Sequence, residues 1–362
     1  MCRPHRRRQT LVLLGALALV ATGCAGNSGH DAPDGAASSS AAAAYVPTTP
    51  ATSPTGDTTA PATPSAPKKT TAGSSTAAAG PAVTVASCGP DETAVIAAVW
   101  ARALDNNGFT VTDAGVMNNR EECLAKLAAG EISLIPDYSS SLARYLSRTH
   151  GDEPLPDGAT GKQAMGTLKK NLPAGLALGK QLPAPVAPVF AVTKQFARAH
   201  HLETLADLRK LDSFLLAVNA CTADDNIDID AVAAHYGIDP GAVTVVAGSE
   251  CNPTGPVQMI SEGKADVAEI FTTTPPLDDA GRPVDLVYLK DPDKQIPTEG
   301  IVPVMYGKAI NGDARGLLAT LNKFLDTDTL VELNTATVGE QAVPLDDIAV
   351  AFIAHHPVGT GR

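Results

Sequence analysis

The sequence lacks the short motifs by which several enzyme classes are recognised. It contains no G-x-S-x-G, H-E-x-x-H or Walker A pattern and no G-x-G-x-x-G after a strand. It also lacks C-x-x-C pairs and, after the arginines of residues 3–8, long clusters of Lys and Arg, and its net charge is −12. Phosphate backbones are bound by clustered basic residues. We therefore predict no catalytic activity, no nucleic-acid partner, no cofactor and no metal site.

Long hydrophobic segments are also missing. The apolar run at residues 11–22 is too short for a membrane span of about 20 residues. Arginines precede it and Cys24 follows it, which is typical of an export signal. Because ATGC at residues 21–24 fits a lipobox, we interpret residues 1–23 as a lipoprotein signal peptide and Cys24 as the lipidated N-terminus. An ordinary secretory signal is the alternative, and Sec and twin-arginine export both stay open.

The segment after the signal is a predicted tether. Residues 24–81 are dominated by Ala, Ser, Thr, Pro and Gly, and such a segment buries too little apolar surface to offset its ordering entropy. We predict a lipid anchor and a disordered linker at the extracytoplasmic face of the cell membrane. Removing the four signal arginines changes the net charge from −12 to −16. Residues 82–362 suffice for one large domain or two lobes.

The exported part contains four cysteines, which are Cys88, Cys123, Cys221 and Cys251. An even number in an oxidising compartment favours two disulfides. Of the three possible pairings we prefer Cys88–Cys123 and Cys221–Cys251, because each closes a short local loop. Free buried thiols are the alternative.

Strand-like and helix-like segments alternate from residue 82 onward. Strands are expected at 83–87, 109–116, 132–136, 188–193, 214–219, 243–248, 265–271, 285–291 and 301–306, and helices at 91–107, 120–129, 139–147, 204–211, 229–237, 257–263, 315–325, 330–337 and 346–356. This alternation predicts mainly parallel sheets flanked by helices. A Pro- and Gly-rich passage divides it at 171–188. We predict an α/β fold with lobe I at 82–187 and 297–362 and lobe II, inserted, at 188–296.

One junction occurs twice in the sequence. PDYSSS (136–141) and EIFTTT (269–274) each place an aromatic residue at the same distance after a glycine, followed by three hydroxyl residues. Ligands of open α/β sheets bind beyond the carboxyl ends of the strands. We therefore predict that Tyr138 and Phe271, with the hydroxyls after them, face one another across a cleft. Helix capping and strand termination would explain either junction taken alone.

Several segments resemble a known family. VTVASCGPDETAVIAAVWARALDNNGFTV (83–111) and NNREECLAKLAAGEISLIPDYSSSLARYL (118–146) look like the substrate-binding proteins of glycine betaine/choline/proline-type (osmoprotectant) ABC importers. The family segment Gly-[ED]-[IL]-D-L-x-P-[ED]-Y-[TS]-G-[TS] reads GEISLIPDYSSS here, with Ser133 for Asp and Ser140 for Gly. VFAVTKQFARAHHLETLADLRKL (189–211) and GKADVAEIFTTTP (263–275) resemble the entry into the second lobe and the segment before the return strand.

The resemblance spans residues 83–356 and implies a two-lobed type II periplasmic-binding-protein fold without catalytic activity. It implies capture of a small osmolyte between the lobes and delivery to an ABC permease and its ATPase. We expect a monomer that reaches the membrane through its lipid anchor. The rival hypothesis is a non-transport surface sensor or scaffold lipoprotein that has the same fold and a degenerate pocket.

The resemblance also suggests ligand residues. Family members commonly enclose a quaternary ammonium group in aromatic rings, because cations are attracted to ring faces. Tyr138 matches the family's tyrosine, whereas Pro188 and Glu299 occupy positions where a ring is usual, and aromatic residues are only 4% of the chain. Glu299 could instead pair with a cationic head group. The predicted ligand residues are Ser87, Asp137, Tyr138, Ser139, Asn219, Thr272 and Glu299.

Two further features receive ordinary explanations. Asp224, Asp225, Asp228 and Asp230 supply carboxylates of the kind that bind calcium, but their loop lacks the glycine and final glutamate of an EF-hand. We interpret it as a solvated acidic loop. Trp100, the single tryptophan, lies among apolar residues of a predicted helix, and we expect it in the core.

Overall fold

The structure, a computed structural model, describes residues 81–89, 92–117, 119–150, 155–156, 159–219, 229–248 and 252–359. The predicted signal peptide, Cys24, the linker up to residue 80, Cys221, Cys251 and three of the four loop aspartates lie outside these residues. The described residues belong to one compact unit. Within them, no helix has the length and apolarity needed to cross a membrane, and no three His, Cys, Asp or Glu side chains are placed to hold a metal ion.

The first of two sheets has the strand order β2-β1-β3-β11-β4, with β5 paired to β11. Its strands are β1 (Ala82–Ser87), β2 (Thr110–Val116), β3 (Leu134–Tyr138), β4 (Leu176–Leu178), β5 (Pro185–Val186) and β11 (Glu299–Tyr306). β1 is parallel to β2 and β3, whereas β11 is antiparallel to β3, β4 and β5. We call this sheet and the helices that cover it lobe I.

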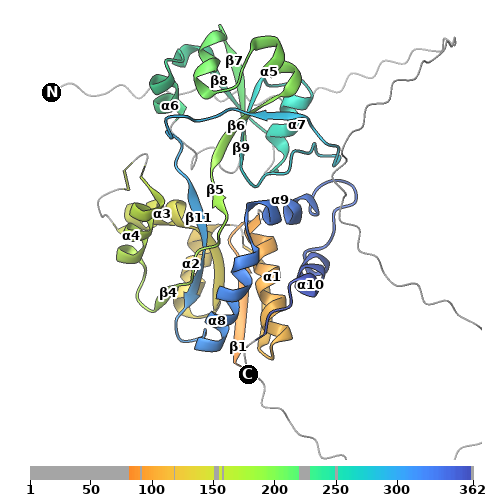
Figure 1. Ribbon diagram of the computed structural model, residues 1–362. Coiled ribbons are helices and arrows are strands. Elements are labelled where there is room, and N and C mark those ends of the chain that lie inside the picture. The colour runs from red at the N-terminus through yellow and green to blue at the C-terminus, as the bar shows by residue number, and fades with distance from the viewer. Residues whose placement is uncertain are drawn as a thin grey trace, which may run out of the picture. The chain divides into compact units, whose positions relative to one another are not determined.

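The second sheet has the order β10-β6-β9-β7-β8. Its strands are β6 (Pro188–Thr193), β7 (Phe214–Val218), β8 (Val243–Ala247), β9 (Val267–Phe271) and β10 (Leu286–Tyr288), and with its helices it forms lobe II. β7 is parallel to β8 and β9, but β6 is antiparallel to β9 and β10. The two strands by which the chain enters lobe II and returns to lobe I, β6 and β11, therefore account for the antiparallel pairs (Figure 1).

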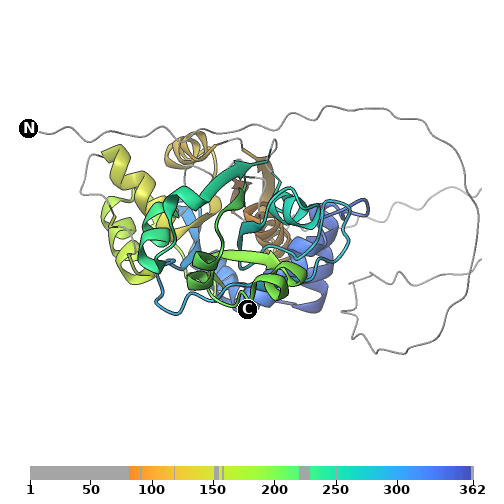
Figure 2. The ribbon, with the colours of Figure 1, turned by 90° about the horizontal axis from the view of Figure 1, so that it is seen from above.

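Two layers of helices cover the sheet of lobe I. The helices are α1 (Glu92–Asn106), α8 (Gly312–Leu321), α9 (Thr327–Thr335) and α10 (Leu345–His355) in one layer, and α2 (Arg120–Ala129), α3 (Ser139–His150) and α4 (Gly161–Asn171) in the other. Figure 2 shows α3 and α4, in yellow-green, and the blue C-terminal helices on opposite sides. Neighbouring residues of β3, Leu134 and Ile135, belong to different cores, because successive strand side chains point to opposite faces. Trp100 is fully buried, as predicted.

Lobe II has shorter helices. They are α5 (Lys194–His200), α6 (Ile229–Tyr236) and α7 (Gly255–Ser261), together with the 3₁₀ segments η1 (Leu205–Lys210) and η2 (Pro240–Ala242); a third, η3 (Asn322–Phe324), follows α8 in lobe I. The capping box at Thr204 and Asp207 is present, but the segment after it is a 3₁₀ helix and not the expected α-helix. α4, α5, β4 and β5 were not predicted.

Local signals explain where α2 begins and ends. The Asn119 side chain accepts a hydrogen bond from the backbone N–H of Glu122, which is a typical N-cap. The helix ends at Gly130, whose φ of 78° lies in the left-handed region. A Cβ there would also lie 2.9 Å from the Tyr306 ring. Both the backbone conformation and the close approach of Tyr306 therefore require glycine at position 130.

Candidate functional site

The two repeated junctions meet in the structure. Tyr138 ends β3 of lobe I and Phe271 ends β9 of lobe II. Their ring centroids are 6.4 Å apart with an interplanar angle of 15°, which is a stacked arrangement. Both rings are partly buried and pack against the same apolar core of lobe I. The two aromatic residues therefore face one another, as predicted, while the cleft expected between them stays a prediction.

A short chain of hydrogen bonds leads from Tyr138 back to lobe II. The Tyr138 hydroxyl donates to Glu92 Oε1 over 2.8 Å. Glu92 lies in the first turn of α1 and is only 6% exposed. Its other oxygen accepts a 3.3 Å bond from Asn334 Nδ2 in α9, and the same nitrogen donates over 2.9 Å to the backbone oxygen of Thr273. Lobe I side chains thus contact the backbone just after β9.

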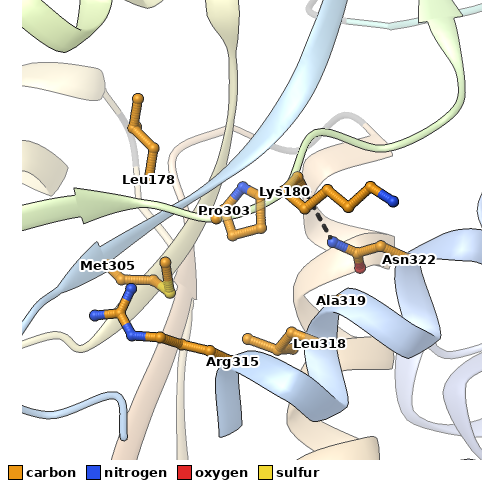
Figure 3. Close-up of a pocket in the computed structure, with 9 residues that line it drawn as sticks. Leu178, Lys180, Pro303, Met305, Arg315, Leu318, Ala319 and Asn322 are labelled. Carbon is orange, nitrogen blue, oxygen red and sulfur yellow. Dashed lines mark hydrogen bonds between the residues drawn. The ribbon is translucent and has the colours of Figure 1, made fainter. Parts of the chain in front are cut away.

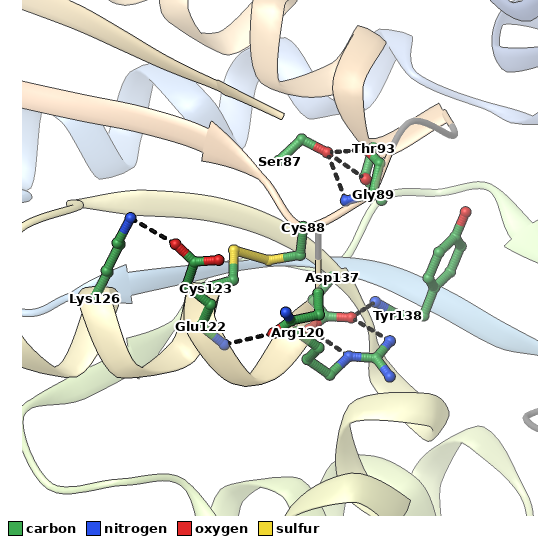
Figure 4. The surroundings of a disulfide bond; sticks show 11 residues. Ser87, Cys88, Gly89, Thr93, Arg120, Glu122, Cys123, Lys126, Asp137 and Tyr138 are labelled. Carbon is green, nitrogen blue, oxygen red and sulfur yellow. Dashed lines mark hydrogen bonds and ion pairs between the residues drawn. A yellow bond between two sulfur atoms is a disulfide. The ribbon is translucent and has the colours of Figure 1, made fainter. Parts of the chain in front are cut away.

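A buried ion pair fixes the end of β3. Asp137 is 3% exposed, and its two oxygens accept from Arg120 Nε at 3.1 Å and Nη2 at 2.9 Å. This two-bond geometry is the strong form of an Arg–carboxylate contact. Asp137 also accepts from the backbone N–H of Tyr138 at 2.7 Å. The Asp137 carboxylate therefore orients the backbone of Tyr138 through a direct hydrogen bond (Figure 4).

The loop after β1 is stapled beside this ion pair. The Ser87 hydroxyl lies 2.6 Å from the Gly89 carbonyl oxygen and 2.8 Å from Thr93 Oγ1, so it joins the loop to the start of α1. Cys88 and Cys123 form the predicted disulfide, with a Cα–Cα distance of 5.7 Å. Figure 4 shows it between the β1 loop and α2.

The N-terminus of α3 is capped from a distant strand. The Glu299 carboxylate accepts from the backbone N–H groups of Ser140 at 3.0 Å and Ser141 at 2.9 Å, and from the Ser141 hydroxyl at 3.1 Å. These N–H groups have no partner within the helix. Ser139 Oγ accepts from the backbone N–H of Gly300 at 3.2 Å. Burial raises the pKa of Glu299, and hydrogen bonds from Ser141 and Ser140 partly oppose the effect.

The two remaining predicted residues serve lobe II and its connection. Thr272 Oγ1 accepts from the backbone N–H of Ala187 and donates to the Pro185 carbonyl oxygen, each over 3.2 Å. It therefore fastens the end of β9 to the chain crossing between the lobes. Asn219, after β7, donates from Nδ2 to the backbone oxygen of Asn252 over 2.9 Å.

The structure thus separates the predicted residues into two groups. Tyr138 presents an aromatic face to the other lobe, whereas polar side-chain atoms of the others have protein partners, as described above. Sequence reasoning missed Arg120, Glu92 and Asn334. An acidic residue in a first helical turn already suits the helix dipole, so Glu92 gave no separate signal. Asn334 lies in a helix, and its role depends on two contacts that are distant in sequence.

A cavity of about 220 Å³ lies elsewhere in lobe I (Figure 3). It is lined by Leu178, Gly179, Lys180, Pro303, Met305, Arg315, Leu318, Ala319 and Asn322. None of the predicted ligand residues lines it. The Asn322 amide is engaged, since Oδ1 accepts from Trp100 Nε1 at 2.8 Å and Nδ2 donates to the Lys180 carbonyl oxygen at 3.4 Å. We therefore place the candidate site at the Tyr138–Phe271 pair.

Two sheets, flanking helices and facing strand ends define a type II periplasmic-binding-protein fold, as predicted. The sheets are mixed and not mainly parallel, because β6 and β11 run antiparallel to their neighbours. Solved structures support this class. A "glycine betaine/carnitine/choline ABC transporter" structure matches with a TM-score of 0.61 at 18% identity, covering 76% of this chain and 98% of the other. The structure of apo YehZ from Escherichia coli matches with a TM-score of 0.57 at 20% identity and with the same coverage. An ABC-transporter choline-binding protein in complex with choline matches with a TM-score of 0.52 at 12% identity, covering 76% of this chain and 89% of the other.

The family follows from a second comparison. Residues 81–355 match the family model described as the substrate-binding domain of ABC-type glycine betaine transport systems. The chain belongs to this family, as the resemblance predicted. It is a substrate-binding protein of the ABC-type osmolyte importer family, and such proteins are extracytoplasmic and work with an ABC transporter.

Proposed function

We propose that this chain is the lipid-anchored receptor of an ABC importer, and that it captures an osmolyte of the glycine betaine, choline or proline type between lobes I and II. The observation that carries the proposal is the Tyr138–Phe271 pair, in which each lobe contributes one ring. Ring faces attract a cationic head group. We place the lobe boundaries after residues 187 and 296, so that each connection lies beside this pair.

The proposed division of labour follows the contacts. Tyr138 and Phe271 contact the solute directly. The other predicted residues shape the site: Asp137 and Ser87 hold the ends of β3 and β1, Ser139 and Glu299 hold the start of α3, and Thr272 and Asn219 hold lobe II. In this arrangement a polar substituent of the solute competes for hydroxyls already engaged, so selectivity depends on the rings.

One observation favours the second candidate, a sensor or scaffold with a degenerate pocket. The ring centroids of Tyr138 and Phe271 are only 6.4 Å apart. A methyl layer inserted between two ring faces needs two carbon–carbon contacts, about 7–8 Å in all. A trimethylammonium group can therefore enter between the faces only after the rings separate. A scaffold would keep them closed.

A binding experiment separates the candidates. The full-length chain, purified in detergent, is titrated calorimetrically with glycine betaine, choline, carnitine and proline. A receptor binds one of them at about micromolar Kd, or about −8 kcal/mol. Tyr138→Ala and Phe271→Ala should each weaken binding at least tenfold, whereas Tyr288→Ala, an exposed aromatic of lobe II, should not. Absence of binding to all four at millimolar concentration would support the scaffold and end the osmolyte proposal.

Anchoring and delivery are tested separately. We propose that Cys24 carries the lipid, because ATGC ends the apolar run. Mass spectrometry should find a lipid-modified cysteine at the mature N-terminus, and Cys24→Ser should release the protein from membranes. Reconstituted permease and ATPase should hydrolyse ATP faster with the solute-loaded protein than with the empty one. An unmodified Cys24 or an unstimulated ATPase would contradict the corresponding step.

A further inference from the structure

Asn334 occupies an unusual position in the connection between the lobes. It is a partly buried residue of α9, and its Nδ2 atom donates both to Glu92 Oε2 and to the Thr273 carbonyl oxygen. A side-chain amide nitrogen has two N–H donors, so each bond can use one of them. The first acceptor, Glu92, also accepts a hydrogen bond from the Tyr138 hydroxyl. The second is backbone of lobe II.

A second contact lies near this bridge. Gly281 is in the loop between β9 and β10, and Gly339 follows α9. A Cβ on Gly339 would lie 2.9 Å from the Cα atom of Gly281 and 3.1 Å from the Ala280 carbonyl oxygen. The two backbones therefore touch, and the closeness depends on glycine. Figure 1 shows the segment after α9 beside the loop that descends from lobe II.

We propose that Asn334 is a closure latch: one amide joins the Glu92–Tyr138 pair of lobe I to the backbone of lobe II, and the Gly281–Gly339 contact completes the closed interface. This inference rests on the proposed function for its ligand step, but the latch itself is a property of the empty protein as well. Asn334 is a positioning residue, since it acts through Glu92 and Thr273.

The latch has a kinetic consequence. Separation of the lobes removes the Asn334–Thr273 bond and the glycine contact together, while the Asn334–Glu92 bond can stay within lobe I. Solute release needs this separation when the solute is held between Tyr138 and Phe271. Loss of one hydrogen bond to a neutral acceptor typically changes an equilibrium about two- to tenfold. Without the latch, we expect bound choline to leave about two- to tenfold faster.

Two readouts on the full-length chain in detergent test the latch. The first is amide hydrogen exchange of the empty protein at residues 271–275 and 336–343, which form the two sides of the interface. The second is release of radiolabelled choline after a chase with excess unlabelled choline. The variants are Asn334→Ala, which removes both bonds, and Asn334→Asp, which adds a carboxylate facing the Thr273 oxygen and Glu92. Glu332→Ala, an exposed change in the same helix, is the control.

The latch predicts faster exchange on both sides and faster release in Asn334→Ala, larger effects in Asn334→Asp, and wild-type behaviour in Glu332→Ala. Exchange and release at wild-type rates in both Asn334 variants would overturn it. If wild-type protein binds no choline or glycine betaine, the proposed function fails, and exchange in the empty protein alone decides the latch. A folding defect is recognised because exchange then also rises in α1.

The glycine contact provides an independent variant. Gly339→Ala places a methyl group against lobe II at a φ of 86°, while Gly263→Ala has a similar φ of 69° and no atom within 4 Å of the new Cβ. Both substitutions strain the backbone comparably. Only Gly339→Ala should speed exchange at residues 271–275 and release of choline. Equal behaviour of the two variants would show that the contact does not hold the lobes.

Discussion

The two junctions have matching sequences but different structures. Tyr138 leads directly from β3 into α3, whereas Phe271 leads from β9 into a turn. In that turn, Thr274 Oγ1 accepts from the backbone N–H of Phe271 at 3.1 Å, and the Thr274 N–H donates to the Phe271 oxygen at 2.9 Å. The first set of hydroxyl residues starts a helix and the second closes a turn.

The difference shows what a repeated local pattern can specify. The aromatic residue ends a buried strand in both copies, so its position depends on the strand alone. The role of the hydroxyls depends on partners from elsewhere in the chain: Glu299 reaches the start of α3, and the segment at Pro185 and Ala187 reaches Thr272. The first junction is also stapled by an ion pair and a disulfide nearby. We therefore expect loss of the disulfide or of the ion pair to have larger effects on stability than changes at the second junction.

Removal of the Cys88–Cys123 disulfide should have the largest effect. The cysteines are 35 residues apart in sequence, and the chain-entropy model gives about 4 kcal/mol for a loop of that size. Cys88→Ala with Cys123→Ala should lower the free energy of unfolding by about that amount in urea denaturation. Alanine is preferred to serine because Cys123 is fully buried. Equal urea midpoints for the wild type and the double variant would mean that the disulfide does not stabilise the first junction.

Asp137→Asn should have the next largest effect. It leaves the Arg120 guanidinium without its carboxylate, and breaking a buried pair costs about 3–5 kcal/mol. Because the Arg120 side chain is 21% exposed, we expect about 2–3 kcal/mol. Replacing both residues by leucine should recover part of the loss. Unchanged stability with lost affinity for glycine betaine would instead make Asp137 a direct ligand residue.

At the second junction, Thr272→Val should lower the free energy of unfolding by about 1 kcal/mol, because the Ala187 N–H and Pro185 oxygen lose their hydroxyl partner. Thr244→Val, on the exposed side of β8, is the matched control and should change stability little. Choline affinity should stay near wild type in both. A selective loss of affinity in Thr272→Val would show that the hydroxyl contacts the solute.

Much of the fold could be predicted because it depends on local patterns. α2 was predicted at residues 120–129, before a glycine, and the structure places it there; the Cys88–Cys123 pair was predicted from its short loop. The passage at 171–188 was interpreted as an interruption because of its prolines and glycines. The structure places β4 and β5 there, since β11 supplies backbone partners for both. Such pairing is non-local and leaves no trace in local composition.

The site was less predictable for the same reason. Tyr138 was found because its strand and its family motif agree. Arg120, Glu92 and Asn334 were missed, because their roles arise only when α1, α2, α9 and the end of β9 come together. Glu299 was predicted to meet a cationic solute, and the structure gives its carboxylate three donors at the start of α3. A strand residue that caps a distant helix cannot be recognised from spacing.

Glu299→Gln should give the smallest effect, and the effect should depend on pH. Burial raises the pKa of Glu299 in the folded protein, so the folded state binds the proton more tightly than the unfolded state does. The stability that this carboxyl contributes is therefore fully present below its ordinary pKa and is lost as the pH rises through the folded pKa. Glutamine does not titrate. The stability of wild type relative to Glu299→Gln should thus fall between about pH 4 and neutrality, measured by urea denaturation, while Glu340→Gln, at an exposed position, controls for the loss of one charge. A difference that stays constant or grows with pH would mean that the hydrogen bonds to α3 outweigh burial, and that the carboxylate caps the first junction more strongly than Thr272 fastens the second.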